Sequence, residues 1–82
     1  MGSKRFGGVL YVAHPDDHDP RHLHAFVGAG RVIIALTLDN RVIVPGRHDA
    51  VKNAKPGEVR KVVKLAVQHF DELLRLWEQM HD

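Results

Sequence analysis

The chain of 82 residues is long enough for one domain, and its 12 lysines and arginines exceed its 10 aspartates and glutamates by two. The absence of cysteine excludes disulfide bonds, thiolate metal ligands and cysteine nucleophiles. No apolar run of signal-peptide length follows the N-terminus, and none reaches the roughly 18 residues of a membrane-spanning helix. We therefore expect a cytoplasmic protein with no membrane partner and a single domain over residues 1–82, of which residues 1–5 form a disordered tail.

Four segments have the composition of β-strands, being short, apolar and rich in β-branched residues. Turn-forming residues separate them: Pro15, then Gly28-Ala29-Gly30, then Asp39-Asn40. The predicted strands are Gly8–Ala13, His22–Val27, Arg31–Leu38 and Arg41–Val44. The sequence therefore predicts a four-stranded, mostly antiparallel sheet.

The register between the second and third predicted strands decides which face of the sheet carries histidines. The more apolar face of the third strand holds Val32, Ile34, Leu36 and Leu38. An even number of residues in the preceding turn places Leu23, Ala25 and Val27 on that face and His22, His24 and Phe26 on the other, whereas an odd number exchanges the two sets. We prefer the even register because it avoids burying two imidazoles under a helix. In both registers His22 and His24 point the same way.

The C-terminal third predicts one long amphipathic helix that begins at Pro56-Gly57-Glu58. Apolar residues recur there in steps of three and four over about 25 residues. They are Val59, Val62, Val63, Ala66, Val67, Phe70, Leu73, Leu74, Trp77 and Met80. Asp71 can cap a second helix, so a kink near Phe70 is the alternative. The expected fold is α+β, a four-stranded, mostly antiparallel sheet with one long C-terminal amphipathic helix packed on one face.

Positive charge gathers in residues 41–64, which hold seven lysines and arginines against Asp49 and Glu58. Arg60 and Lys61 occupy the early turns of the predicted helix, where they oppose its dipole. A basic zone of this kind favours a phosphate group or an acidic protein as partner. The candidate nucleic-acid or phosphate contacts are Arg21, Arg47, Lys55, Arg60, Lys61 and Lys64.

The stretch from Asp17 to His24 concentrates three imidazoles, two carboxylates and one guanidinium within eight residues. One interpretation is a metal site. Two histidines at a spacing of two on a strand can bind one ion, a third imidazole and an oxygen ligand can come from the loop, and His14 can approach from the end of the first strand. Such a ligand set suits zinc, the only cofactor that the residues suggest. The candidate metal ligands are His18, His22 and His24.

The same stretch also permits proton-transfer catalysis without a metal. Histidine both donates and accepts protons near neutral pH, so His22 and His24 could serve as acid and base in RNA cleavage, with Arg21 beside the developing charge on phosphorus. His18 is the third catalytic candidate. A purely structural role is the remaining alternative, in which the imidazoles bond to nearby carboxylates and backbone carbonyls and fix the crossing between strands.

Two segments resemble a bacterial family catalogued as domain of unknown function 4160. The family has a His-x-Pro-Pro-His-Phe-His signature after a first strand and a helix that ends in His-x-x-Glu-Leu-x-x-x-Trp. Residues 18–24 follow the first pattern, with Arg21 in place of its second proline and Leu23 in place of phenylalanine. Residues 69–77 match the second pattern completely. The resemblance covers about residues 6 to 78 and implies a shared fold. Family members are often encoded beside another small protein, which resembles a toxin–antitoxin arrangement and implies a small cognate protein partner.

Two classes of function remain open. In the first, the protein is a toxin–antitoxin-type component that acts on or binds RNA through its histidines and basic zone. In the second, it is a non-catalytic protein-binding module whose histidine loop is structural or fixed by zinc. The uncovered second sheet face and Trp77 favour a homo-oligomer, such as a dimer, or a protein partner.

Overall fold

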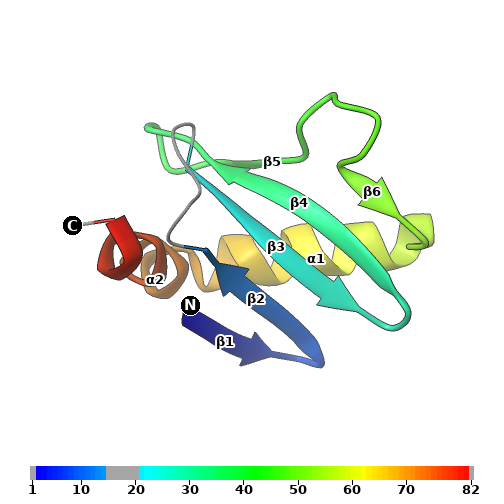
Figure 1. Cartoon of the computed structure of the whole chain (residues 1–82), viewed down its shortest axis with the longest axis horizontal. Helices are drawn as coiled ribbons and strands as arrows, with labels where there is room; N and C mark the ends of the chain where they lie inside the picture. Colours follow the sequence, from blue (N-terminus) through cyan, green and yellow to red (C-terminus); the bar gives the residue numbers. More distant parts are fainter. Residues whose placement is uncertain (1, 15–20, 82) are drawn as a thin grey trace.

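The computed structural model of the protein describes residues 2–14 and 21–81, and within these ranges it contains six strands followed by two helices (Figure 1). The strands are β1 (Gly2–Phe6), β2 (Val9–Ala13), β3 (His22–Val27), β4 (Gly30–Leu36), β5 (Val42–Ile43) and β6 (Val51–Lys52). The helices are α1 (Pro56–Gln68) and α2 (Phe70–His81). The α+β class and the antiparallel sheet predicted from the sequence are confirmed.

The strands form one sheet in the order β1-β2-β3-β4-β5, and β6 also pairs with β4. The predicted count of four strands is wrong because it omits β1 and β6. Residues 2–5, expected in a disordered tail, lie in β1, which pairs with β2 along its whole length. Gly7 and Gly8 join the two strands at φ angles of 55° and 83°, which glycine adopts without steric cost.

The even register between β3 and β4 is confirmed, since Leu23 faces Ile34 and Ala25 faces Val32 across the strands. Their face of the sheet is the buried one. Its strands contribute Val9, Tyr11, Ala13, Leu23, Ala25, Val27, Val32, Ile34 and Leu36 to the hydrophobic core. Leu38 does not join them and is 92% exposed. It lies beyond the end of β4, in a loop closed by a 2.8 Å hydrogen bond from the Thr37 N–H to the Arg41 carbonyl.

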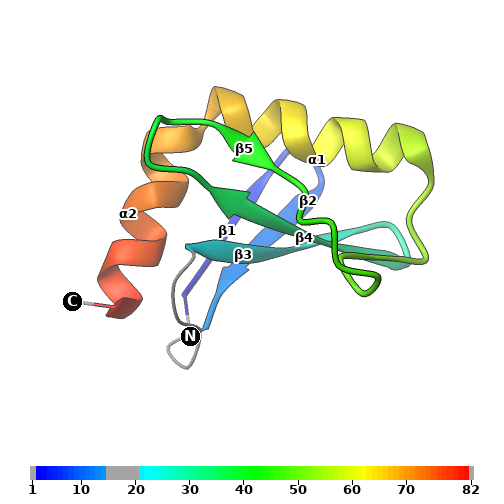
Figure 2. The same cartoon turned by 90° about the horizontal axis from the view of Figure 1, so that it is seen from above.

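The prediction of one long helix is wrong, and the alternative of a kink near Phe70 is correct. The chain breaks at His69, whose φ and ψ are −114° and 30°. Helix α1 lies across the buried face of the sheet, and α2 turns away at its end to pack on β1 and β2 (Figure 2). The break rotates the apolar stripe, so Val67 is 57% exposed whereas Leu76, outside the predicted stripe, is 4% exposed. Neither α1 nor α2 is long and apolar enough to cross a membrane.

Tyr11 connects the sheet to α1 through a buried hydrogen bond. Its hydroxyl donates to the Val62 carbonyl at 2.7 Å, across 51 residues of sequence. Burial raises the pKa of Tyr11 because the phenolate would lose its hydration. The hydroxyl therefore stays protonated in the folded state, and its hydrogen bond restrains the distance between α1 and β2.

Replacing Tyr11 with phenylalanine is expected to lower the free energy of unfolding by about 1 kcal/mol at neutral pH, because one hydrogen bond is lost while the ring stays in place. The raised pKa of Tyr11 stabilises the folded state below the unfolded-state pKa of 10.0, and this contribution is lost as the pH rises above that value. Urea unfolding measures the free energy of unfolding at about pH 7 and about pH 11. Between these pH values it should fall less for Tyr11→Phe than for the wild type. Equal falls in the two proteins would contradict a raised pKa for the buried Tyr11 hydroxyl.

Candidate functional site

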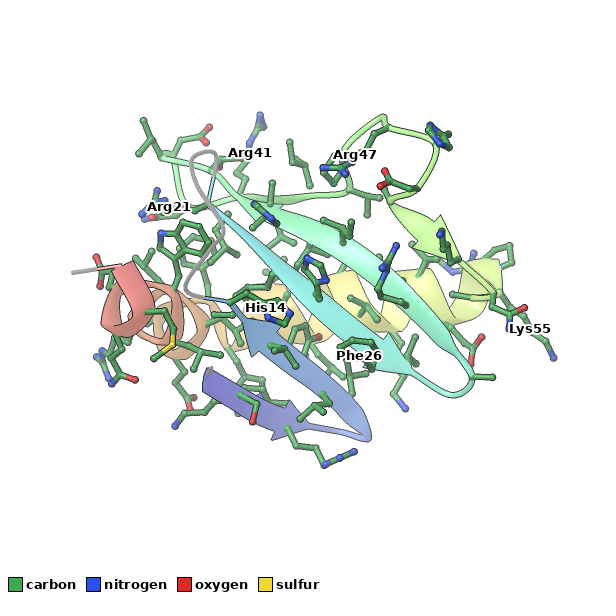
Figure 3. The ribbon with its side chains drawn as sticks, viewed as in Figure 1. His14, Arg21, Phe26, Arg41, Arg47 and Lys55 are labelled. Atoms are coloured by element: carbon green, nitrogen blue, oxygen red, sulfur yellow. The ribbon has the colours of Figure 1, made fainter. Side chains whose placement is uncertain are left out.

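The face of the sheet turned away from α1, here called the open face, carries most of the chemically reactive strand residues (Figure 3). It contains every second residue of each long strand, as the strand registers require. Its members are Ser3, Arg5, Leu10, Val12, His22, His24, Phe26, Arg31, Ile33, Ala35, Ile43 and Lys52. No strand of the described chain contains an aspartate or glutamate. The open face is therefore positive or neutral throughout its strands.

Three cations and an aromatic ring align at one end of this face. Across neighbouring strands, Arg5 pairs with Leu10, and Leu10 pairs with Phe26. Phe26 pairs with Arg31 on its other side, and Arg31 pairs with Lys52. We call Arg5, Phe26, Arg31 and Lys52 the basic row. The Phe26 side chain is 41% exposed, although it is large and apolar. An exposed aromatic ring among cations offers a flat face on which a planar ligand group can stack.

The cations of the basic row lack carboxylate partners among the described residues, where the salt bridges join other pairs. The Arg31 Nη2 donates to the backbone carbonyl of Asp49 at 3.1 Å, which orients the guanidinium without neutralising it. Arg5 and Lys52 are exposed. Arg5 and Lys52 are therefore accessible to an anionic ligand, whereas Arg31 is half-buried.

Three histidine rings gather at the other end of the open face. The His14 and His24 ring centroids are 4.9 Å apart in an edge-to-face arrangement, and those of His22 and His24 are 5.8 Å apart. We call His14, His22 and His24 the imidazole cluster. All three side chains are half-buried, and His14 lies at the end of β2 (Figure 3). On the same face, the cross-strand neighbours of His24 on its two sides, Val12 and Ile33, are buried apolar side chains.

Helix α2 reaches this cluster through Trp77, whose ring centroid lies 5.8 Å from that of His22. The angle of α2 depends on His69, which stacks on Phe6 with centroids 3.9 Å apart and planes 7° from parallel. The His69 Nδ1 also lies 3.2 Å from the Glu72 Oε1. Residues of both sequence patterns thus meet in space: His69 and Glu72 fix the start of α2, and Trp77 contacts the imidazole cluster.

The basic residues selected from the sequence do not converge on the imidazole cluster. Arg21 donates from Nη2 to the Thr37 carbonyl at 3.2 Å, and it lies apart from His14 in Figure 3. Arg47 binds Asp49 through two hydrogen bonds of 2.5 and 2.8 Å, which lower the pKa of that carboxyl to about 2. Lys55 lies at the far end of α1 in the same figure. The remaining three, Arg60, Lys61 and Lys64, are exposed on α1, on the opposite side of the sheet.

The predicted metal site is assembled only in part. His22 and His24 share one face, but His18 lies outside the described residues. Within residues 2–14 and 21–81, no group of three or more histidine, aspartate or glutamate side chains could hold a metal ion. The described donors therefore do not by themselves fit the tetrahedral ligand set of zinc.

Sequence reasoning overlooked the basic row and treated His14 only as an additional metal ligand. Arg31 could have been found, because strand alternation places it on the face of Ile33, opposite the apolar set. Arg5 and Lys52 could not, because β1 and β6 were not predicted.

The fold and the open face define a class of small α+β domains in which helices cover one face of an antiparallel sheet and histidines lie on the other. A family model described as Domain of unknown function (DUF4160) matches residues 9–78, so the chain belongs to this family. The resemblance inferred from the sequence is confirmed. No curated protein and no solved structure matches the chain.

Proposed function

We propose that the protein binds single-stranded RNA across the open face of its sheet. The observation that carries this proposal is the basic row, an exposed aromatic ring with three cations that have no carboxylate partner among the described residues. It lies on a sheet whose described strands carry no acidic residue. Proteins that bind single-stranded nucleic acids combine a positive surface that follows the backbone with aromatic side chains on which bases stack.

The shape of the open face favours a single strand over a duplex. A sheet face can take unstacked bases flat against Phe26, whereas the bases of a duplex remain stacked on one another. Each base stacked on an aromatic side chain contributes about 1–3 kcal/mol. Arg5 and Lys52 flank this ring on outer strands, where they can meet the phosphates on either side of the stacked base.

Fluorescence anisotropy with a labelled single-stranded RNA of about 10 nucleotides tests this proposal. Phe26→Ala is expected to weaken binding by about 5- to 150-fold, the equivalent of one lost stack. Arg5→Gln and Lys52→Gln are each expected to reduce the slope of log K against log salt by about 1. The same RNA annealed to its complement should bind more weakly.

Arg60→Gln is the matched control, because it removes an exposed cation from α1 on the opposite side of the sheet. It should leave the salt slope unchanged. If Arg60→Gln reduces the slope while Arg5→Gln does not, the RNA contacts lie on the basic helix and the open-face proposal is wrong. No binding by the wild-type protein at low salt would also overturn it.

A second candidate function, a non-catalytic protein-binding module, is favoured by the apolar exposure of the same face. Phe26 and Ile43 are large, exposed hydrophobic side chains on the open face. A second copy of the chain, or the small cognate protein of a toxin–antitoxin-type pair, would bury them. In light scattering at high concentration, a dimer that Ile43→Ser dissociates would support this candidate, and a strict monomer would remove self-association.

A further inference from the structure

We propose that the imidazole cluster cleaves the bound RNA strand, with His14 and His24 as the proton-transfer pair. This proposal rests on the proposed RNA binding. The two side chains come from neighbouring strands, and their rings are the closest pair in the cluster, with centroids 4.9 Å apart. His24 lies two residues from Phe26 on the same face of β3, a separation of about 7 Å. A strand stacked on Phe26 therefore brings an adjoining phosphodiester to this pair.

The reaction is a transesterification within the RNA. The ribose 2′-oxygen forms a bond to phosphorus while the bond from phosphorus to the 5′-oxygen breaks. One imidazole accepts the proton of the 2′-hydroxyl, and the other, as an imidazolium, gives a proton to the departing 5′-oxygen. The products are a 2′,3′-cyclic phosphate and a 5′-hydroxyl. The step requires no metal, oxidant or water, and it leaves the two histidines with their protonation states exchanged.

The surroundings of the pair suit this chemistry. Val12 and Ile33, buried apolar side chains of the neighbouring strands, flank His24 on the same face of the sheet. The basic row crosses β3 at Phe26, two residues from His24. Its positive charge stabilises the negative charge that develops on the phosphorane. The His22 ring centroid lies 5.8 Å from those of both Trp77 and His24, so we assign His22 a positioning role.

The test uses a single-stranded oligonucleotide with one ribose among deoxyriboses, incubated with the purified full chain in EDTA. Mass spectrometry of the products should show one cut, after the ribose, ending in a 2′,3′-cyclic phosphate. The all-deoxy oligonucleotide should bind but remain intact. His14→Phe and His24→Phe, which keep a ring, should each slow cleavage by about 10²- to 10⁴-fold while anisotropy still reports binding. His14→Asn and His24→Asn repeat the test with smaller side chains, and thermal unfolding confirms that each variant is folded.

Two further variants make the assignment specific. His48→Ala removes an exposed histidine of the loop before β6 and should leave cleavage unchanged. His22→Phe, which preserves a ring against Trp77, should slow cleavage by less than about tenfold. If His22→Phe abolishes cleavage and His14→Phe does not, the assignment of His14 is wrong.

The remaining outcomes separate this proposal from the binding proposal. Bound but uncut RNA would overturn cleavage and leave the binding intact. Cleavage that EDTA abolishes and zinc restores would replace proton transfer with metal chemistry. Cleavage that survives in His14→Phe and His24→Phe alike would indicate a contaminating nuclease. RNA that is neither bound nor cut would overturn both proposals.

Discussion

The Trp77→Ala variant is expected to lose about 3–5 kcal/mol of its free energy of unfolding, the usual cost of removing a buried tryptophan side chain. Trp77 is 5% exposed, and its ring connects α2 to His22 at the start of β3. Truncation leaves a cavity at that junction and removes the ring beside His22. Because a domain of this size has a stability of only about 5–15 kcal/mol, the variant should be close to unfolding at physiological temperature.

Urea unfolding followed by far-UV circular dichroism measures this loss without depending on tryptophan fluorescence. Val67→Ala is the matched control, because its side chain is largely exposed on α1, and its cost should stay within about 0.5 kcal/mol. Trp77→Phe should lie between the two, since it keeps part of the packing. If Trp77→Ala costs no more than Val67→Ala, the junction between α2 and the sheet is not a packed one.

Gly30→Ala is expected to destabilise the protein by about 1–3 kcal/mol through overpacking. A Cβ atom at Gly30 would meet the Asn53 carbonyl oxygen, and it would lie 2.8 Å from the Ala54 backbone nitrogen. Both neighbours are backbone atoms of the segment between β6 and α1, so no side-chain rotation can relieve the contact. Either that segment must move, or β4 must move and disturb its pairing with β3 and β6.

Gly46→Ala provides the comparison, because a Cβ atom there would meet nothing within 4 Å. Neither Gly30 nor Gly46 has a positive φ, so alanine at either position avoids the backbone strain of a left-handed conformation. Gly46→Ala should be neutral or stabilise the protein by a few tenths of a kcal/mol through the unfolded state. Thermal unfolding of the two variants side by side measures the difference. Equal midpoints would mean that β4 does not approach Asn53 as closely as described.

The sheet was predictable because its central strands are short apolar runs bounded by turn residues, and β3 also alternates in burial. In β3, Leu23, Ala25 and Val27 alternate with His22, His24 and Phe26, and burying two imidazoles under a helix would be costly. That cost selected the correct register without any knowledge of the turn. The break between the helices was harder to predict, because apolar residues in steps of three and four continue through His69. The stacking of His69 on Phe6 fixes the angle there, and a contact so distant in sequence leaves no periodic pattern.

Strand β1 could not be recognised from its composition. Ser3, Lys4 and Arg5 do not alternate with apolar residues, and charged residues are common on edge strands, where they discourage unwanted pairing. Its structure depends on β2, since pairing with a neighbour outweighs local preference in strands. The Gly7-Gly8 turn was the available signal, and it indicates a hairpin only when both flanking segments are accepted as strands.

The candidate site was predicted only in part, because its residues come from strands that are distant in sequence. Counting charge along the chain grouped Lys55 with Arg60 and Lys64, which folding places on the helix side of the sheet. The cations that share the histidines' face are distant in sequence: Arg5, Arg31 and Lys52 belong to three different strands. Strand alternation brought His22 and His24 together, but the proximity of His14 depends on the pairing of β2 with β3.

Every strand precedes both helices in the chain, and this order matters during synthesis. A ribosome that has released the whole sheet has not yet released the segment from Pro56 to His81 that covers its apolar face. Until that segment emerges, Tyr11, Leu23 and Ile34 have nothing to pack against, and exposed apolar surface of this kind promotes aggregation. Fragments cut short before the helices should therefore be insoluble or held by chaperones, and stable folding should wait until both helices have emerged.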